Sequence, residues 1–404
     1  MRIRAFQGLV PDPAQVSEVA CVPYDVVDAT EAAALAAGHP HSLLHVDRAE
    51  IDLPKGTNPY GDAVYAKARE NFLQLQKDGV LRRETGPCLY LYQQQMGEHR
   101  QRGLVAVCHV EDYDAEIIKK HEKTRKDKED DRTRLVDTLS ANTGPIFLTY
   151  RDTAALSALA AEQAGQVPQH DFTAPDGIRH TVWRIPGGDA WVKAFGSVPV
   201  SYIADGHHRA ASAARVARLR REKNPKHTGS EDYNWFLSVL FPAGELKILP
   251  YHRIVTDLNG LTPEAYLAKV GAVFKVEEQA TPDAKAAGQV SMYLGGRWHG
   301  LVCPVDPRAD PVARLDVSIL QEKLLAPILG IDDPRTSKRI DFVGGIRGPG
   351  ELSRRVDAAG GVAFSMYPTT VAQLMDIADA GQIMPPKSTW FEPKLRSGLF
   401  IHTF

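Results

Sequence analysis

The stretch SYIADGHHRAAS, residues 201–212, joins an apolar run typical of a strand to an Ala-rich run typical of a helix. Five turn-forming or polar residues, Asp205 to Arg209, lie between the two runs. A strand that ends in a short turn and opens a helix points the first backbone N–H groups of that helix at the turn, where the helix dipole adds partial positive charge. The stretch therefore predicts a mixed α and β fold with a turn that can hold an anion.

The residue types in this turn suit a phosphate group. Gly206 permits an approach of backbone to ligand that a Cβ would block, and Arg209 offers paired N–H donors for phosphate oxygens. His207 and His208 can donate further hydrogen bonds, whereas Asp205 can hold a ribose hydroxyl, a water on Mg²⁺ or one of the histidines. A structural alternative stays open, in which Asp205 only caps the helix, Arg209 covers its surface and the histidines are buried and satisfied.

The composition of the chain limits its partners. The 404 residues include 48 Lys and Arg against 50 Asp and Glu, a formal charge of −2, which argues against a general electrostatic attraction to nucleic acid or to an anionic membrane. The four cysteines have no spacing typical of a zinc site, so we expect buried thiols and assign no metal ligands. No apolar run approaches the roughly 18 residues of a membrane-spanning helix, and we expect a soluble cytoplasmic protein.

The order of predicted elements indicates two domains. Residues 87–110 predict a hairpin, and residues 58–79 predict a helix. The apolar face of that helix is expected to contain Ala63, Tyr65, Ala66, Phe72 and Leu75. A glycine and a proline in DLNGLTPEAY, residues 257–266, precede a new helix, so we place a boundary near residue 256. We expect an α/β region over 1–255 and an α+β domain over 256–404.

A second group of candidates lies in HEKTRKDK, residues 121–128, at the start of a highly charged segment. On a helix, His121, Arg125, Lys128 and Arg132 would form one basic stripe. Glu122 beside the stripe could take a proton from a substrate hydroxyl, with His121 as its competitor, and Arg125 could neutralise charge. The alternative is a solvated charged face without a function.

Three further places are candidates for substrate contacts. Tyr24 and Asp25 follow Pro23 at an expected strand end, although they could equally form a packed turn. Asn142 leads directly into the apolar strand expected over residues 145–150. Near the C-terminus, Lys387 follows two prolines that restrict its backbone, in a region that also contains Lys394; ordinary surface lysines are the alternative there.

Several motifs resemble known families. The DGHHR turn is similar to that of the archaeal free serine kinases, which belong to the ParB/sulfiredoxin-like superfamily. Over nearly its whole length the chain resembles an uncharacterised bacterial family, domain of unknown function 1015 (DUF1015). The motifs that carry this second resemblance are VPYDVV (22–27), HVDRAEIDL (45–53), HEKT (121–124), DGHHR (205–209) and MPPKSTWFEPKLRSGLFIH (384–402).

The resemblance implies a ParB/sulfiredoxin-like nucleotide-binding part in which Asp205 to Arg209 surround the phosphates. It implies a kinase that uses ATP or ADP, with Mg²⁺, to phosphorylate the hydroxyl of a small metabolite such as free L-serine. Two alternatives remain open: a ParB-like switch that binds a nucleotide without turnover, and a nucleotide phosphohydrolase. The glutamates with which the kinase activates its substrate have no matching motif in this chain. The acceptor, the choice between ATP and ADP, and a homodimer are likewise left open.

Overall fold

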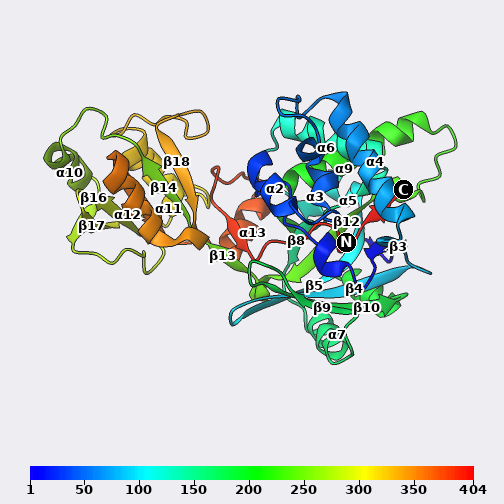
Figure 1. Ribbon diagram of the computed structural model, residues 1–404. Helices are drawn as coiled ribbons and strands as arrows, with labels where there is room; N and C mark the ends of the chain where they lie inside the picture. Colours follow the sequence, from blue (N-terminus) through cyan, green and yellow to red (C-terminus); the bar gives the residue numbers. More distant parts are fainter. The chain divides into compact units, whose positions relative to one another are not determined.

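A computed structural model describes residues 1–404 and divides them into two compact units (Figure 1). The first unit contains Met1–Leu246 together with the last segment of the chain, Pro393–Phe404, and the second contains Lys247–Glu392. The domain boundary was expected near residue 256. That residue follows a strand which belongs to the second unit, since this unit begins at Lys247. None of the helices combines the length and the apolar character needed to cross a lipid bilayer.

The first unit is built on one nine-stranded mixed sheet, which confirms the predicted mixed α and β fold. Its strands run in the order β6-β11-β8-β12-β5-β4-β10-β9, with β1 paired to β5. Two pairs of neighbouring strands are parallel, β11 with β6 and β12 with β8, and the remaining pairs are antiparallel. The strands are β1 (Ile3–Arg4), β4 (Cys88–Met96), β5 (His99–His109), β6 (Ile118–Lys119), β8 (Ile146–Tyr150), β9 (His170–Thr173), β10 (Arg179–Pro186), β11 (Ser201–Asp205) and β12 (Trp235–Pro242).

Helices bury apolar side chains in two clusters of this unit. One cluster joins the sheet to α7, α8 and the Ala-rich face of α9, and the other joins α2, α3 and α4 to α6. Figure 1 shows α4, α6 and α9 side by side, so that α6 connects the two clusters. The helices are α1 (Val16–Val19), α2 (Ala29–Ala36), α3 (Leu44–Asp47), α4 (Asp62–Lys77), α5 (Val110–Asp114), α6 (Lys126–Leu139), α7 (Ala154–Ala164), α8 (Asp189–Phe195) and α9 (His207–Lys223).

Helix α4 is the helix expected over residues 58–79, but two of its predicted core positions are wrong. Ala63 and Ala66 are exposed, whereas Val64 and Ala68 are buried with the other predicted members of the face. The reason is that small alanines fit either side of a helix, and the larger Val64 decides which side faces the core.

The C-terminal segment closes the first unit. Strand β21 (His402–Thr403) pairs with β7 (Ala141–Asn142), and the Ile401 backbone exchanges hydrogen bonds with Leu9. Leu9 belongs to β2 (Leu9–Pro11), which pairs with β3 (Leu81–Arg83). The two ends of the chain thus belong to one folded body.

The second unit has a six-stranded antiparallel sheet in the order β15-β17-β16-β19-β14-β18 and a separate pair, β13 with β20. Strands β16 and β17 of this sheet form a hairpin. The strands are β13 (Lys247–Leu249), β14 (Tyr251–Val255), β15 (Lys275–Glu278), β16 (Gln289–Leu294), β17 (Arg297–Val302), β18 (Ile340–Gly344), β19 (Val362–Met366) and β20 (Trp390–Glu392). The helices are α10 (Pro263–Gly271), α11 (Asp316–Leu320), which continues as a π-helical turn over Gln321–Leu325, α12 (Gly348–Ala359) and α13 (Val371–Asp379).

Candidate functional site

The turn between β11 and α9 depends on a glycine. Strand β11 ends at Asp205, and Gly206 has φ +92°, in the left-handed region that favours glycine. A Cβ at Gly206 would lie 3.0 Å from Nε of Arg209, so the guanidinium group folds back over the turn. The first N–H to bond within the helix is that of Ala210, to the Gly206 carbonyl. The preceding N–H groups at the start of α9 are therefore not used by the helix itself.

Arg209 is held in place by one carbonyl and two carboxylates. Its Nη1 donates to the Pro145 carbonyl, and its Nη2 lies 3.3 Å from Oδ2 of Asp205 and 3.9 Å from Oδ2 of Asp25. Its Nε is buried and has no hydrogen-bond partner. The guanidinium group is thus fixed in position and still has an unused donor.

Asp205 is held in its charged form. Burial by itself would raise its pKa, but Lys394, Arg209 and His207 together hold the pKa at about 2. The Nζ atom of Lys394 lies 3.8 Å from Asp205 Oδ2. The sequence did not assign Lys394 to this turn, because nothing local to residues 393–404 indicates which part of the chain they pack against.

The two histidines of the turn hold the segment over residues 121–125. Nε2 of His207 accepts a long hydrogen bond, 3.5 Å, from the backbone N–H of His121, and Nε2 of His208 accepts one of 3.0 Å from the N–H of Arg125. Both rings must then carry their proton on Nδ1. Burial lowers the pKa of both histidines, which keeps Nε2 free to accept.

The predicted helical stripe through His121 and Arg125 is wrong. Helix α6 begins at Lys126, and Arg125 is its N-cap residue with an extended backbone. Residues 121–125 are not helical, and the N–H groups at the two ends of this segment, those of His121 and Arg125, bond to the imidazoles of the turn. The guanidinium group of Arg125 is bound to Asp127, at 2.8 and 3.2 Å, on the surface.

The two candidate bases lie on either side of His207. The His121 ring packs edge-on against the His207 ring, with centroids 4.5 Å apart, and its Nδ1 is buried without a partner. Burial lowers the pKa of His121 to about 4, so the ring is neutral at pH 7. Oε2 of Glu122 lies 3.8 Å from Nδ1 of His207, and the Glu122 side chain is half exposed. Glu122 is the more accessible of the two.

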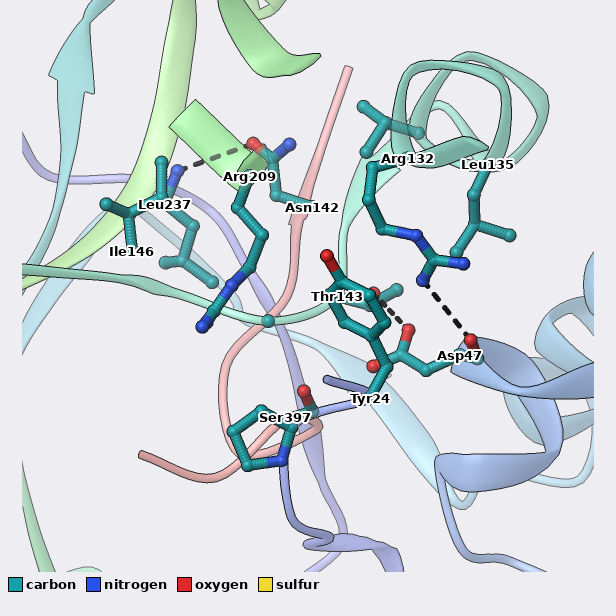
Figure 2. A pocket seen from close by; sticks show the side chains of 13 residues that line it. Tyr24, Asp47, Arg132, Leu135, Asn142, Thr143, Ile146, Arg209, Leu237 and Ser397 are labelled. Carbon is teal, nitrogen blue, oxygen red and sulfur yellow. Dashed lines mark hydrogen bonds between the residues drawn. The ribbon is translucent and has the colours of Figure 1, made fainter. Parts of the chain in front are cut away.

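A small cavity of about 30 Å³ lies beside Arg209. Figure 2 shows the side chains of Arg209 and Arg132 reaching toward it from α9 and α6, with Tyr24 between them. The Tyr24 ring lies 4.0 Å beneath the Arg132 guanidinium group. The Asn142 side chain also lines this cavity, but its Oδ1 accepts a hydrogen bond from the Leu237 N–H, 3.3 Å, and so connects two strands.

Residues that the sequence did not single out complete the wall of this cavity. The buried carboxylate of Asp47 accepts a hydrogen bond from Oγ1 of Thr143, 2.6 Å, and a second one from Ser397. A Cβ on Gly144 would lie 2.7 Å from Oγ of Ser397, so this glycine permits the close approach of the C-terminal segment. The polar wall therefore depends on contacts between segments that are remote in sequence.

Lys387 belongs to the second unit, whereas the other predicted site residues belong to the first. Its backbone has φ +56°, and its carbonyl accepts a hydrogen bond from Arg253. Its Nζ lies 5.3 Å from the centroid of the Tyr251 ring. A substrate contact by Lys387 stays a prediction.

The sequence matches a family model described as "Protein of unknown function (DUF1015)" over residues 3–318. The chain belongs to this family. The membership indicated by the VPYDVV, HEKT and DGHHR motifs is thereby confirmed. A search of curated proteins found no match.

Among solved structures, the chain is similar to a free serine kinase in complex with AMP, with 13% identity and a TM-score of 0.35, over 71% of this chain and 86% of that one. A conserved hypothetical protein from Pyrococcus furiosus gives 13% identity and a TM-score of 0.36, over 72% and 93% of the two chains. A C-terminally truncated SbnI from Staphylococcus aureus gives 11% identity and a TM-score of 0.35, over 72% and 85%.

Proposed function

We propose that the first unit binds a nucleotide at the turn Asp205–Arg209 and transfers its terminal phosphoryl group to the hydroxyl of a small metabolite, with free L-serine as a candidate. The observation that carries this proposal is the turn itself. The start of a long helix, a glycine without a Cβ and an arginine with an unpaired Nε lie together. N–H groups, a helix dipole and a guanidinium group are the donors that phosphate oxygens prefer.

In the proposed reaction the acceptor oxygen forms a bond to the terminal phosphorus, and the bond from that phosphorus to its bridging oxygen breaks. The nucleotide leaves with one phosphate fewer. Arg209 and the N–H groups of α9 stabilise the negative charge on the phosphoryl oxygens. Glu122 takes the hydroxyl proton, because its carboxylate is accessible and lies next to His207. His207 and His208 contribute by accepting the N–H groups of His121 and Arg125, which fixes the segment that carries Glu122.

Phosphoryl transfer normally uses Mg²⁺, which takes one or two protein carboxylates and completes its shell with phosphate oxygens and water. The chain has no cluster of three acidic, His or Cys side chains that could hold a metal by itself. Asp25 and Asp205 both lie within 4 Å of Nη2 of Arg209, so these two carboxylates fit the one or two protein ligands that Mg²⁺ requires. The ion would supply positive charge to the phosphate oxygens.

The activity is tested by incubating the protein with ATP or ADP, Mg²⁺ and L-serine and following the reaction by phosphorus NMR. Formation of phosphoserine supports the kinase. Free phosphate alone indicates a phosphohydrolase, and nucleotide binding without turnover indicates a switch. If calorimetry detects no binding of either nucleotide, all three forms of the proposal fail.

The roles of individual residues are separated by two variants. Glu122→Gln should leave nucleotide affinity unchanged and lower turnover about 100-fold or more, because it removes only the base. Arg209→Lys should weaken nucleotide binding by about 2 kcal/mol through the loss of paired donors. Glu116→Gln, another exposed acid of this unit, is the matched control and should change neither value. An unchanged rate in Glu122→Gln would assign the base to His121 or to another residue.

A further inference from the structure

The second unit contains a cavity of about 280 Å³ that the first unit's turn does not share. Its walls combine apolar side chains from α11, the π-helical turn and β18 with a few charged groups. The apolar members are Val317, Leu325, Pro334, Ile340, Phe342, Pro385 and Pro386, and the polar ones are Arg253, Gln321, Asp332, Asp333 and Arg335. A concave, mainly apolar space with a few convergent polar groups is typical of a small-molecule site.

Arg253 is the unusual member of this lining. It lies on β14 and is 4% exposed. Its Nη1 donates to the Tyr251 carbonyl and its Nη2 to the Lys387 carbonyl, 3.1 Å, and the Phe342 ring lies 5.4 Å away. It forms no ion pair within this unit. Burial lowers its pKa to about 10, so it is still charged at pH 7.

The other charges of the cavity do not neutralise Arg253. Arg335 is bound to Asp333, with an N–O distance of 2.9 Å, and both side chains reach solvent. Asp332 is exposed. A buried cation is normally paired with an anion, because leaving it alone costs free energy. One positive charge thus remains on the cavity wall.

The backbone around Arg253 is also irregular. Lys387 has φ +56°, although it is not a glycine, and its carbonyl is the group that Arg253 binds. The turn Gln321–Leu325 is π-helical and contributes two residues to the lining. Such local departures from regular structure concentrate at ligand sites. They are an observation separate from the charge of Arg253.

We propose that this cavity binds a small organic monocarboxylate, whose carboxylate pairs with Arg253 and whose apolar part lies against Val317, Leu325, Ile340 and Phe342. A guanidinium group matches the two oxygens of a carboxylate. One uncompensated positive charge matches a monoanion, whereas a phosphate monoester would bring a charge of about −1.5 to −2 next to Asp332 and Asp333. This site is independent of the proposed phosphoryl transfer.

Calorimetry on the full chain tests the proposal with benzoate and hexanoate as probes, benzamide and hexanamide as neutral matches, and inorganic phosphate. We expect both acids to bind and both amides to bind at least about tenfold more weakly, because the amides cannot form the ion pair. Equal binding of acids and amides overturns the proposal. So does binding of phosphate alone, or no binding of either acid at about 10 mM.

Variants assign the binding to this cavity. Arg253→Met should reduce the affinity for benzoate at least about tenfold, and Ile340→Phe should do the same by filling the space while leaving Arg253 in place. Arg354→Met is the control, since Arg354 is exposed, paired with Glu351 and absent from the lining. Thermal unfolding establishes that each variant is folded. If Arg253→Met does not fold, Ile340→Phe decides, and benzoate binding retained in a folded cavity variant overturns the proposal.

Discussion

Two buried arginines, Arg209 in the first unit and Arg253 in the second, differ in their partners. In the first unit, Arg209 lies against Asp205 and Asp25, and Lys394 approaches the same Asp205 oxygen as Arg209. In the second unit, the hydrogen-bond partners of Arg253 are backbone carbonyls. Asp316 of that unit is its acidic counterpart, because its carboxylate accepts one N–H, from Gly288, and forms no ion pair.

This difference shows in the pKa values. Burial opposes the charged form of a carboxylate, and neighbouring cations restore it. For Asp205 the cations prevail and hold the pKa at about 2. For Asp316 burial prevails and raises the pKa to about 6. The first unit therefore has a pre-assembled charged site, whereas Arg253 and Asp316 in the second unit have no neighbour of opposite charge within hydrogen-bond distance.

The largest expected effect comes from removing each buried arginine in turn. Arg209→Met should lower the free energy of unfolding of the first unit by about 3 kcal/mol, because it leaves carboxylates and the Pro145 carbonyl without their donor. Arg253→Met should change the stability of the second unit by less than about 1 kcal/mol, because the lost hydrogen bonds are offset by removal of a lone buried charge. Scanning calorimetry measures both. Equal losses would contradict the comparison.

The next largest effect is the pH dependence of folding stability, which has opposite signs for Asp316 of the second unit and Asp205 of the first. The folded pKa of Asp316, about 6, lies above its ordinary value of 3.8, so its carboxylate destabilises the fold above pH 6 and carries no penalty below pH 4. Asp316→Asn should therefore stabilise the second unit by about 2 kcal/mol at pH 7 and have little effect at pH 4.

Asp205 provides the matched control for this measurement. Its folded pKa lies below the ordinary value, so it stabilises the fold above about pH 4, and that contribution is lost as the pH falls toward 2. Asp205→Asn should lower stability at pH 7 by about 2 kcal/mol. Thermal unfolding between pH 4 and pH 8 distinguishes the two variants. A stabilising effect of Asp205→Asn at pH 7 would show that its cations do not hold the charge.

The sequence was sufficient for features that depend on neighbouring residues. The hairpin of β4 and β5 and the strand, turn and helix around Gly206 follow from local patterns. These elements are fixed by hydrophobic period, turn residues and caps, which are visible within a few positions.

Features that depend on distant partners were not predictable. The charged pattern of residues 121–132 satisfies the rules for a helix, yet the imidazoles of His207 and His208 bind the N–H groups of His121 and Arg125, and the helix begins only at Lys126. Lys394 reaches Asp205 only because the end of the chain returns to the first unit. The isolation of Arg253 is likewise a property of the folded unit.

The smallest expected effect concerns the part of the turn that carries no charge. His208 is neutral at pH 7, because burial lowers its pKa, and it accepts the Arg125 N–H through Nε2. His208→Ala should cost about 1 kcal/mol locally and speed amide exchange over residues 121–125 roughly fivefold. His227→Ala, a change to a ring that stacks on Tyr233, is the control. Because the ion cluster of Arg209 and Asp205 stays intact, overall stability should change little. Unchanged exchange at Arg125 would mean that charge alone, without the histidines, positions the segment beside the turn.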